Sequence, residues 1–68
     1  MTTAAALIAK GASRLTLAGI ETPQREARLL LAHLLDMPAA ELALTPDRDI
    51  DVTTASRFAE AIERREAH

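Results

Sequence analysis

Apolar residues recur along the first part of the chain with the period of an α-helix. Between residues 3 and 18 they are spaced by three or four positions, which places them on one side of a helix. That side holds Ala4, Leu7, Ile8, Gly11, Leu15 and Ala18. Glycine costs about 1 kcal/mol relative to alanine inside a helix, so we expect a second helix to cross closely at Gly11. Gly19 is expected to end the helix in a left-handed conformation, with Ile20 folding back on Leu15.

A second helix is predicted from Pro23 to Asp36. Thr22 is a favourable N-cap whose hydroxyl can accept a hydrogen bond from the first turn, and proline suits the first helical position. One apolar arc of this helix contains Ala27, Leu30, Leu31, Leu34 and Leu35. Leu29 and Ala32 lie nearly opposite, and a helix that is apolar on two sides is typical of the centre of a small bundle. Leu29 leaves room for a further helix, either a fifth helix of the chain or one from a second copy.

Prolines mark the ends of the second and third helices. Met37–Pro38 and Thr45–Pro46 are expected to stop them, because the residue before proline avoids the helical region. Between these stops, Pro38–Leu44 is predicted as a short helix anchored by Leu42.

A polar connection then leads to the last helix, which is predicted to begin near Asp51 or Thr53. Its buried face is expected to hold Val52, Ala55, Phe58, Ala59 and Ile62. No run alternates with period 2, so strands are not expected. The predicted fold is all-α, a small bundle of four to five helices in a single domain spanning residues 1–68. The last residues carry no helix stop signal, so we expect a domain boundary inside a longer protein.

Composition narrows the functional classes. The 68 residues include no cysteine, two histidines, one aromatic residue, ten acidic and eight basic residues. The mildly acidic balance does not favour nucleic-acid binding, and no apolar run is long enough to cross a bilayer. The absence of cysteine and of a secretory signal is consistent with a cytoplasmic protein that does not bind membranes.

The possible ligand and DNA motifs all have simpler interpretations. Residues 47–51 have the acid spacing that opens an EF-hand loop, but Val52 replaces its turn glycine and Phe58 its bidentate glutamate. We interpret the segment as a polar loop whose last acid, Asp51, caps the next helix. His33 is expected at the surface. A helix-turn-helix reading is poor because leucines fill the would-be recognition helix.

Four arginines are the candidate contact residues, with an ordinary surface role as the alternative. Arg25 and Arg28 share the polar arc of the second helix with Glu26, where a local surface pair network is the simpler interpretation. Arg64 and Arg65 can contact a phosphate or a partner, or can lie in solvent at a helix end, where cations are favoured.

Two segments of the chain resemble a known family. Thr22–His33 is similar to the "Ser/Thr-Pro-x-x-Asp-Ala-x-x-Leu-Leu" segment of the HemK/PrmC family of protein-(glutamine-N5) methyltransferases, which modify class-1 peptide chain release factors. Phe58–Arg65 resembles the family's "Phe … Arg-Arg" helix at the right distance. Two positions depart from the pattern, because Glu26 stands where aspartate is common and Arg28 where glutamate is frequent. The resemblance covers the whole chain, but only the N-terminal quarter of such an enzyme.

The resemblance implies a role in substrate recognition. The intact protein would transfer a methyl group from S-adenosylmethionine to the glutamine of the release factor's Gly-Gly-Gln motif. Cofactor and catalytic residues of the family lie in a following Rossmann-like domain, so none is assigned here and the 68 residues are expected to be inactive. The small domain would help to bind the release factor through its exposed arginines, Arg25, Arg28, Arg64 and Arg65. The alternative is a free-standing protein–protein interaction or dimerisation module.

Overall fold

The computed structural model describes residues 2–67 and places four helices close to the predicted positions. The elements in chain order are β1 (Thr2–Thr3), α1 (Ala4–Leu17), α2 (Pro23–Leu35), α3 (Ala39–Ala43), β2 (Asp49–Ile50) and α4 (Val52–Glu66). The helix bounds agree with the predicted ones to within about two residues. The mainly helical class is confirmed.

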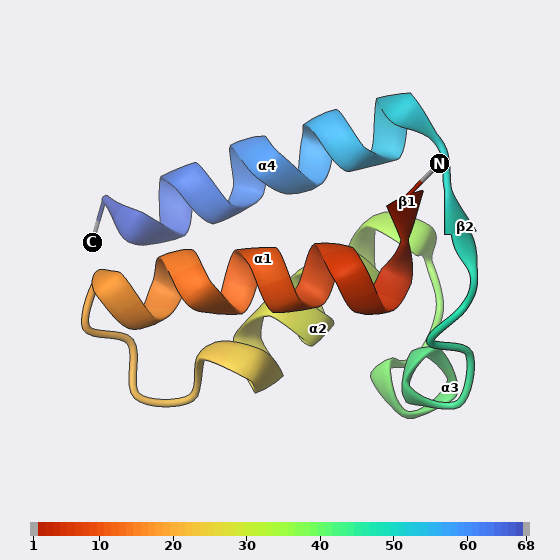
Figure 1. Cartoon of the computed structure of the whole chain (residues 1–68), viewed down its shortest axis with the longest axis horizontal. Helices are drawn as coiled ribbons and strands as arrows, with labels where there is room; N and C mark the ends of the chain where they lie inside the picture. The colour runs from red at the N-terminus through yellow and green to blue at the C-terminus, as the bar shows by residue number, and fades with distance from the viewer. Residues whose placement is uncertain (1, 68) are drawn as a thin grey trace.

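The helices form two layers. Figure 1 shows α1 and α4 side by side, both beginning at the end of the molecule where β1 and β2 lie and both running in the same direction. Helix α2 lies behind them and runs back against α1, and the short α3 lies below β2. Helices α1 and α4, which are far apart in the sequence, therefore lie next to each other on one open face of the molecule.

The expectation that strands are absent is wrong, although the two strands are only two residues long. Thr2 pairs with Ile50 and Thr3 with Asp49 in an antiparallel arrangement. The neighbouring loop also serves α1, because the N–H groups of Ala4 and Ala5 donate to the carbonyls of Arg48 and Pro46 at 2.8 and 3.0 Å. This pairing satisfies the free donors at the start of α1. Two residues are too few to show a period-2 pattern, so the sequence gives no signal for it.

Helices α1 and α2 end in hydrogen-bonded turns of the same kind. At the end of α1, Ile20 N–H donates to the carbonyl of Leu15 and Gly19 N–H to that of Thr16, both at 3.0 Å. Gly19 has φ +85°, as predicted. In α2 the left-handed position is occupied by Asp36, with φ 56°, and Met37 N–H donates to Ala32 at 3.1 Å. Aspartate is one of the few residues other than glycine that tolerates this conformation.

The helix starts differ from the prediction at one position. Thr3 and Asp51 cap α1 and α4, accepting hydrogen bonds from the N–H groups of Ala6 and Thr54. Thr22 makes no side-chain cap hydrogen bond at the start of α2, so the predicted cap is wrong. The ψ angle of Thr22 is 66°, whereas that of Thr3 is 161°. The extended value at Thr3 directs its hydroxyl toward the first turn of α1.

The core is small and lies among all four helices. Its fully buried large side chains are Leu15, Leu31, Leu42 and Ile62, with Phe58 only 2% exposed. The predicted anchor Leu42 and the predicted close crossing at Gly11 are confirmed, since a Cβ on Gly11 would lie 2.8 Å from Phe58 Cζ.

Three predicted core positions are wrong, because Ala18, Val52 and Ala59 are exposed. Leu29, expected on the side of the second helix left open to a further helix, is 47% exposed. Val52 is the first residue of α4 and precedes the part of the helix that packs against its neighbours. Ala18 lies beyond the last turn of α1. The face of α4 that is buried includes Ala61 in place of Ala59, because it turns toward α2 as well as α1.

Candidate protein-binding surface

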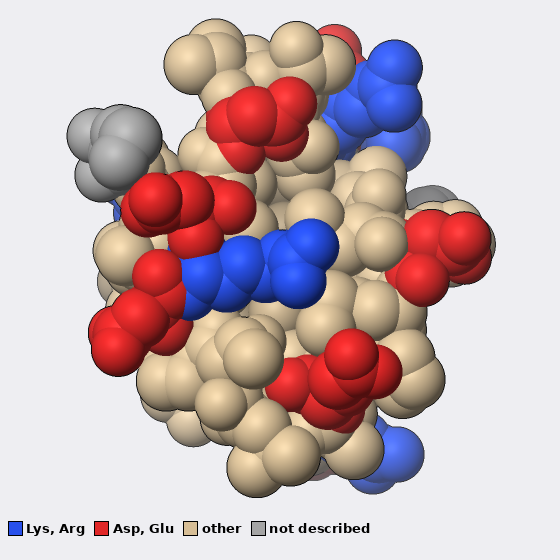
Figure 2. Space-filling model, turned by 90° about the vertical axis from the view of Figure 1, so that its right-hand side faces the viewer, with Lys and Arg blue, Asp and Glu red and all other residues tan. Residues whose placement is uncertain are grey.

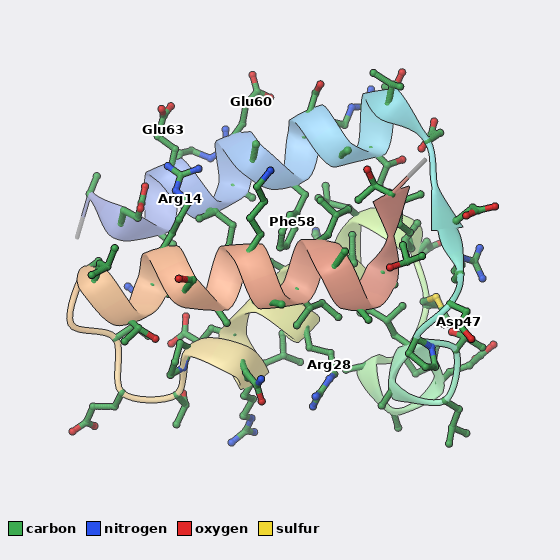
Figure 3. All side chains as sticks on the ribbon, in the orientation of Figure 1. Arg14, Arg28, Asp47, Phe58, Glu60 and Glu63 are labelled. Carbon is green, nitrogen blue, oxygen red and sulfur yellow. The ribbon has the colours of Figure 1, made fainter. Side chains whose placement is uncertain are left out.

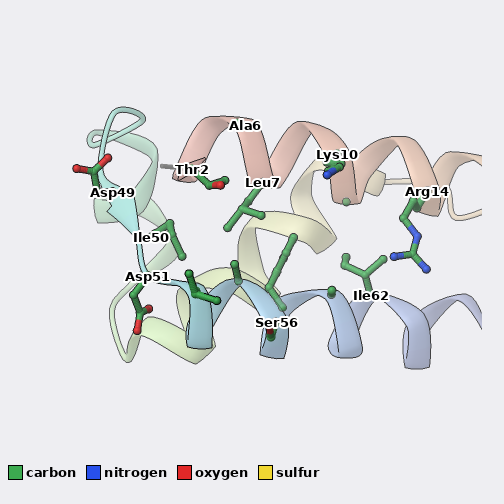
Figure 4. A pocket seen from close by; sticks show the side chains of 15 residues that line it. Thr2, Ala6, Leu7, Lys10, Arg14, Asp49, Ile50, Asp51, Ser56 and Ile62 are labelled. Carbon is green, nitrogen blue, oxygen red and sulfur yellow. The ribbon is translucent and has the colours of Figure 1, made fainter.

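The main surface feature is a groove between α1 and α4, which we call the α1–α4 groove. Its volume is about 1210 Å³, and Leu7, Gly11, Phe58 and Ile62 form its apolar floor. Figure 4 shows Leu7 and Ile62 pointing into it from the two facing helices. The groove is therefore an apolar depression on the open face of the molecule.

Small residues keep the groove open. Ala6 on α1 and Ala55, Ser56 and Ala59 on α4 line its sides, so no long side chain from these positions covers the floor. The ring of Phe58 points from α4 toward α1 (Figure 3) and lies against the backbone of Gly11. Any larger residue at position 11 would separate the two helices.

The two ends of the groove differ in charge. Asp49 and Asp51 lie at the end where β2 leads into α4, and Lys10 and Arg14 line the groove farther along α1 (Figure 4). Figure 2 shows the β2 end of the molecule face on, with acidic side chains gathered around a basic one. The segment in this region also contributes Asp47 and Arg48. The groove is therefore acidic at the β2 end and basic farther along α1, so its two ends can be distinguished by charge.

Two bidentate ion pairs attach the last turn of α4 to the other long helices. The guanidinium of Arg14 on α1 donates to Glu66 through Nη2 at 2.6 Å and Nε at 3.1 Å. The guanidinium of Arg65 donates to Glu26 on α2 through Nε at 2.6 Å and Nη2 at 3.1 Å. These hydrogen bonds lower the pKa of Glu26 and raise that of Arg14. Neighbouring residues of α4 thus hold it on two sides.

The four predicted contact arginines do not form one patch. Arg65 is half-buried and holds Glu26, so the local pair network expected within α2 is replaced by a pair between helices. Arg25 lies beside Leu29 in one shallow hollow, and Arg28 lies in another between α1 and α3. Arg64 is exposed on α4. The α1–α4 groove is lined by none of these four arginines.

The groove itself was not predicted. Its sequence signal is the combination of Gly11 in one helix with two alanines, Ala55 and Ala59, four residues apart in another. Periodicity assigned those alanines to a buried face, because small residues suit a core and an open groove equally well.

The described residues offer little for chemistry. Within residues 2–67 no three histidine, aspartate or glutamate side chains are grouped so that they could hold a metal ion. None of the helices in that range has the length and apolar character needed to span a membrane. The predicted surface residue His33 is exposed, as expected. Recognition of another molecule is the property that this surface supports best.

The comparisons with known proteins agree on one family. The family model described as "PrmC N-terminal domain" matches residues 6–68. A release factor glutamine methyltransferase of Rhodospirillum rubrum is 40% identical over 60 residues, which are 88% of this chain and 18% of that protein. The proteins of the same name from Aliivibrio fischeri and Deinococcus radiodurans are each 36% identical, over 88% and 90% of this chain and 21% and 22% of their own lengths. No solved structure matches significantly.

Fold and surface together define a small helical domain with an apolar groove on one face, built from four helices over residues 2–67. The chain belongs to the PrmC N-terminal domain family. It spans about a fifth of the length of the curated relatives that it matches.

Proposed function

We propose that this chain is the N-terminal domain of a cytoplasmic release factor glutamine methyltransferase and that it helps to bind the release factor. The family match over residues 6–68 is the observation that carries the proposal. The relatives are about five times longer than the matched region, which leaves room for a catalytic domain. That domain would use S-adenosylmethionine and methylate the glutamine of the Gly-Gly-Gln motif.

The contribution of the small domain would be positional. Binding a remote part of a protein substrate can orient the reacting side chain, and binding energy used in this way raises catalytic efficiency. Residues 2–67 supply helices, a groove and exposed arginines, all of which suit contact with a protein. The catalytic step would take place on the following domain.

The four arginines remain the proposed polar contacts, although only Arg25 and Arg64 are exposed, and Arg28 and Arg65 are partly buried. Reversing Arg65 would place two glutamates together at Glu26 and weaken the fold, so loss of binding in that variant would be ambiguous. Arg64→Glu is the cleaner test because Arg64 is exposed. Arg57→Glu, an exposed arginine on the same helix and outside the predicted set, is the matched control.

Calorimetric titration of the chain with an intact class-1 release factor tests the proposal directly. We expect saturable binding at low salt that weakens at moderate salt, because exposed charges are screened. Arg64→Glu should weaken binding about fivefold, which corresponds to ~1 kcal/mol, and Arg57→Glu should change it less than twofold. Absence of binding by the unaltered chain at both salt concentrations would contradict a recognition role for the isolated domain. Equal effects of the two variants would show that contact depends on general charge rather than on Arg64.

A further inference from the structure

We infer that the α1–α4 groove is the docking site for one amphipathic helix of the release factor, about three turns long and antiparallel to α1 and α4. The inference rests on the proposed function, and adds to it the surface used and the kind of segment bound. The groove is apolar along its floor, bounded at both ends and charged unequally along its length. Each of these properties constrains the occupant.

The length of the groove sets the length of the occupant. It extends along α1 from the β1–β2 pair to Arg14, which is attached to Glu66 and closes the far end. Eleven residues of helix at 1.5 Å each span about 16 Å, or three turns. An amphipathic helix of that length presents apolar side chains at positions i, i+3, i+4 and i+7 to a groove of this kind.

The alanine-lined sides set the width. Ala6 and Ala59 are exposed on facing helices and flank the floor formed by Leu7 and Phe58. Short side chains at these positions let the backbone of a third helix come close. A long side chain there would occupy the space in which the third helix lies.

The charges set the direction. Helices α1 and α4 both begin at the acidic end of the groove (Figure 1), so the positive ends of two helix dipoles lie there, although their first N–H groups are already capped. The negative C-terminal end of an antiparallel helix is favoured at that position, and a basic residue in its last turn would meet Asp49 and Asp51. Arg14 is already paired, so Lys10 is the cation that an acidic residue of the occupant would contact.

The spacing of these charges makes the occupant recognisable. Lys10 lies seven residues along α1 from Thr3, the partner of Asp49 in the strand pair. The docked helix should therefore carry an acidic residue followed by a basic one about seven positions later on the same face, since seven residues make roughly two turns. An apolar stripe lies between them.

The first test changes the groove wall without changing charge. Ala6→Gln places a longer side chain on the wall, and Ala40→Gln makes the same change at an exposed position of α3 outside the groove. In calorimetric titrations with an intact class-1 release factor, Ala6→Gln should bind at least tenfold more weakly than the unaltered chain. Ala40→Gln should stay within twofold. Circular dichroism and the thermal midpoint establish that both variants remain folded.

The second test reverses the charges. Lys10→Glu and Asp49→Lys should each weaken binding about fivefold, a typical loss for a partly exposed charge contact. Both positions are exposed. Among the described residues, neither side chain caps a helix or forms an ion pair. Glu21→Lys, at an exposed position that does not line the groove, is the charge-reversal control.

The outcomes separate the inference from the proposed function. Binding by the unaltered chain that is lost in Ala6→Gln but kept in Ala40→Gln supports docking in the groove. Binding that is equal in all three chains overturns the groove and leaves release-factor binding intact. No binding by the unaltered chain overturns both. A dimer that sedimentation shows to dissociate in Ala6→Gln alone overturns the inference, because the groove is then filled by a second copy.

Discussion

At the scale of single residues, one position is restricted by packing space and two have a left-handed backbone conformation. Gly11 is fixed by space, because Phe58 and Ile62 approach the place that a Cβ would occupy to 2.8 and 3.0 Å. Gly19 is fixed by its left-handed φ of +85°, with no atom within 4 Å of its missing Cβ. Asp36 has the same handedness without being glycine. Residue type alone does not distinguish these causes.

Gly11→Ala is expected to destabilise the fold by about 1 kcal/mol. Alanine gains about 1 kcal/mol of helix propensity, but the added methyl group overpacks the crossing, at a typical cost of 1–3 kcal/mol. Chemical denaturation of the variant measures the difference. Ser13→Ala, at an exposed position of the same helix, is the control for propensity and should be neutral or slightly stabilising. An unchanged or raised stability in Gly11→Ala would show that α4 moves away freely.

At the scale of secondary structure elements, the ends of helices could be predicted better than their buried faces. Gly19 and the two X–Pro pairs gave correct ends because their effects are local. The strand pair, the Arg65–Glu26 pair and the groove join residues far apart in sequence. The residues on one side of such a contact do not specify the residues on the other side, so periodicity could not reveal these three features. Asp36 went unrecognised as a left-handed residue for a different reason, since aspartate favours several turn conformations.

The Glu26→Gln variant is expected to lose less stability than the unaltered chain when the pH is lowered. The hydrogen bond from Arg65 lowers the pKa of Glu26 below its ordinary 4.5 in the folded chain. This contribution is present in full above the pKa of the unfolded chain and is lost as the pH falls through the folded pKa. The stability difference between the unaltered chain and Glu26→Gln should therefore shrink as the pH falls through and below the ordinary value of 4.5.

Thermal unfolding at a series of pH values measures this difference. Arg65→Gln should give the same narrowing, because it removes the other half of the pair. Parallel curves down to pH 3 would show that the pair contributes nothing to folding. The partly exposed side chains make the effect sensitive to salt, so it should be largest at low ionic strength.

At the scale of the whole molecule, four helices share a core with few large side chains. Leu15, Leu31, Leu42 and Ile62 are the largest that are fully buried, and each of the four helices contributes one of them. A domain of this size buries about 60% of its unfolded surface. Such a domain is marginally stable, yet each of the four helices is tied to the same core.

The 68-residue chain is expected to unfold in one cooperative step. A small domain with a shared core has no part that can remain folded alone. Urea titration followed by circular dichroism should give a slope near the low end of the usual range, about 1 kcal/mol/M. Amide exchange of α2 and α4 should report the same global opening. A transition in which α4 unfolds before α1 and α2 would contradict a single cooperative unit.

The hydrogen bonds that begin α1 have a consequence for the order of events during synthesis. Ala4 and Ala5 donate to carbonyls of Arg48 and Pro46, more than forty residues later in the chain. At roughly 5–20 residues per second, the ribosome makes those acceptors about two to nine seconds after their donors. The first helix to emerge is thus among the last to be completed, and α4 follows β2 after a single residue. Closure of the strand pair and docking of α4 belong to one late event, before which the side of α1 that faces α4 is uncovered.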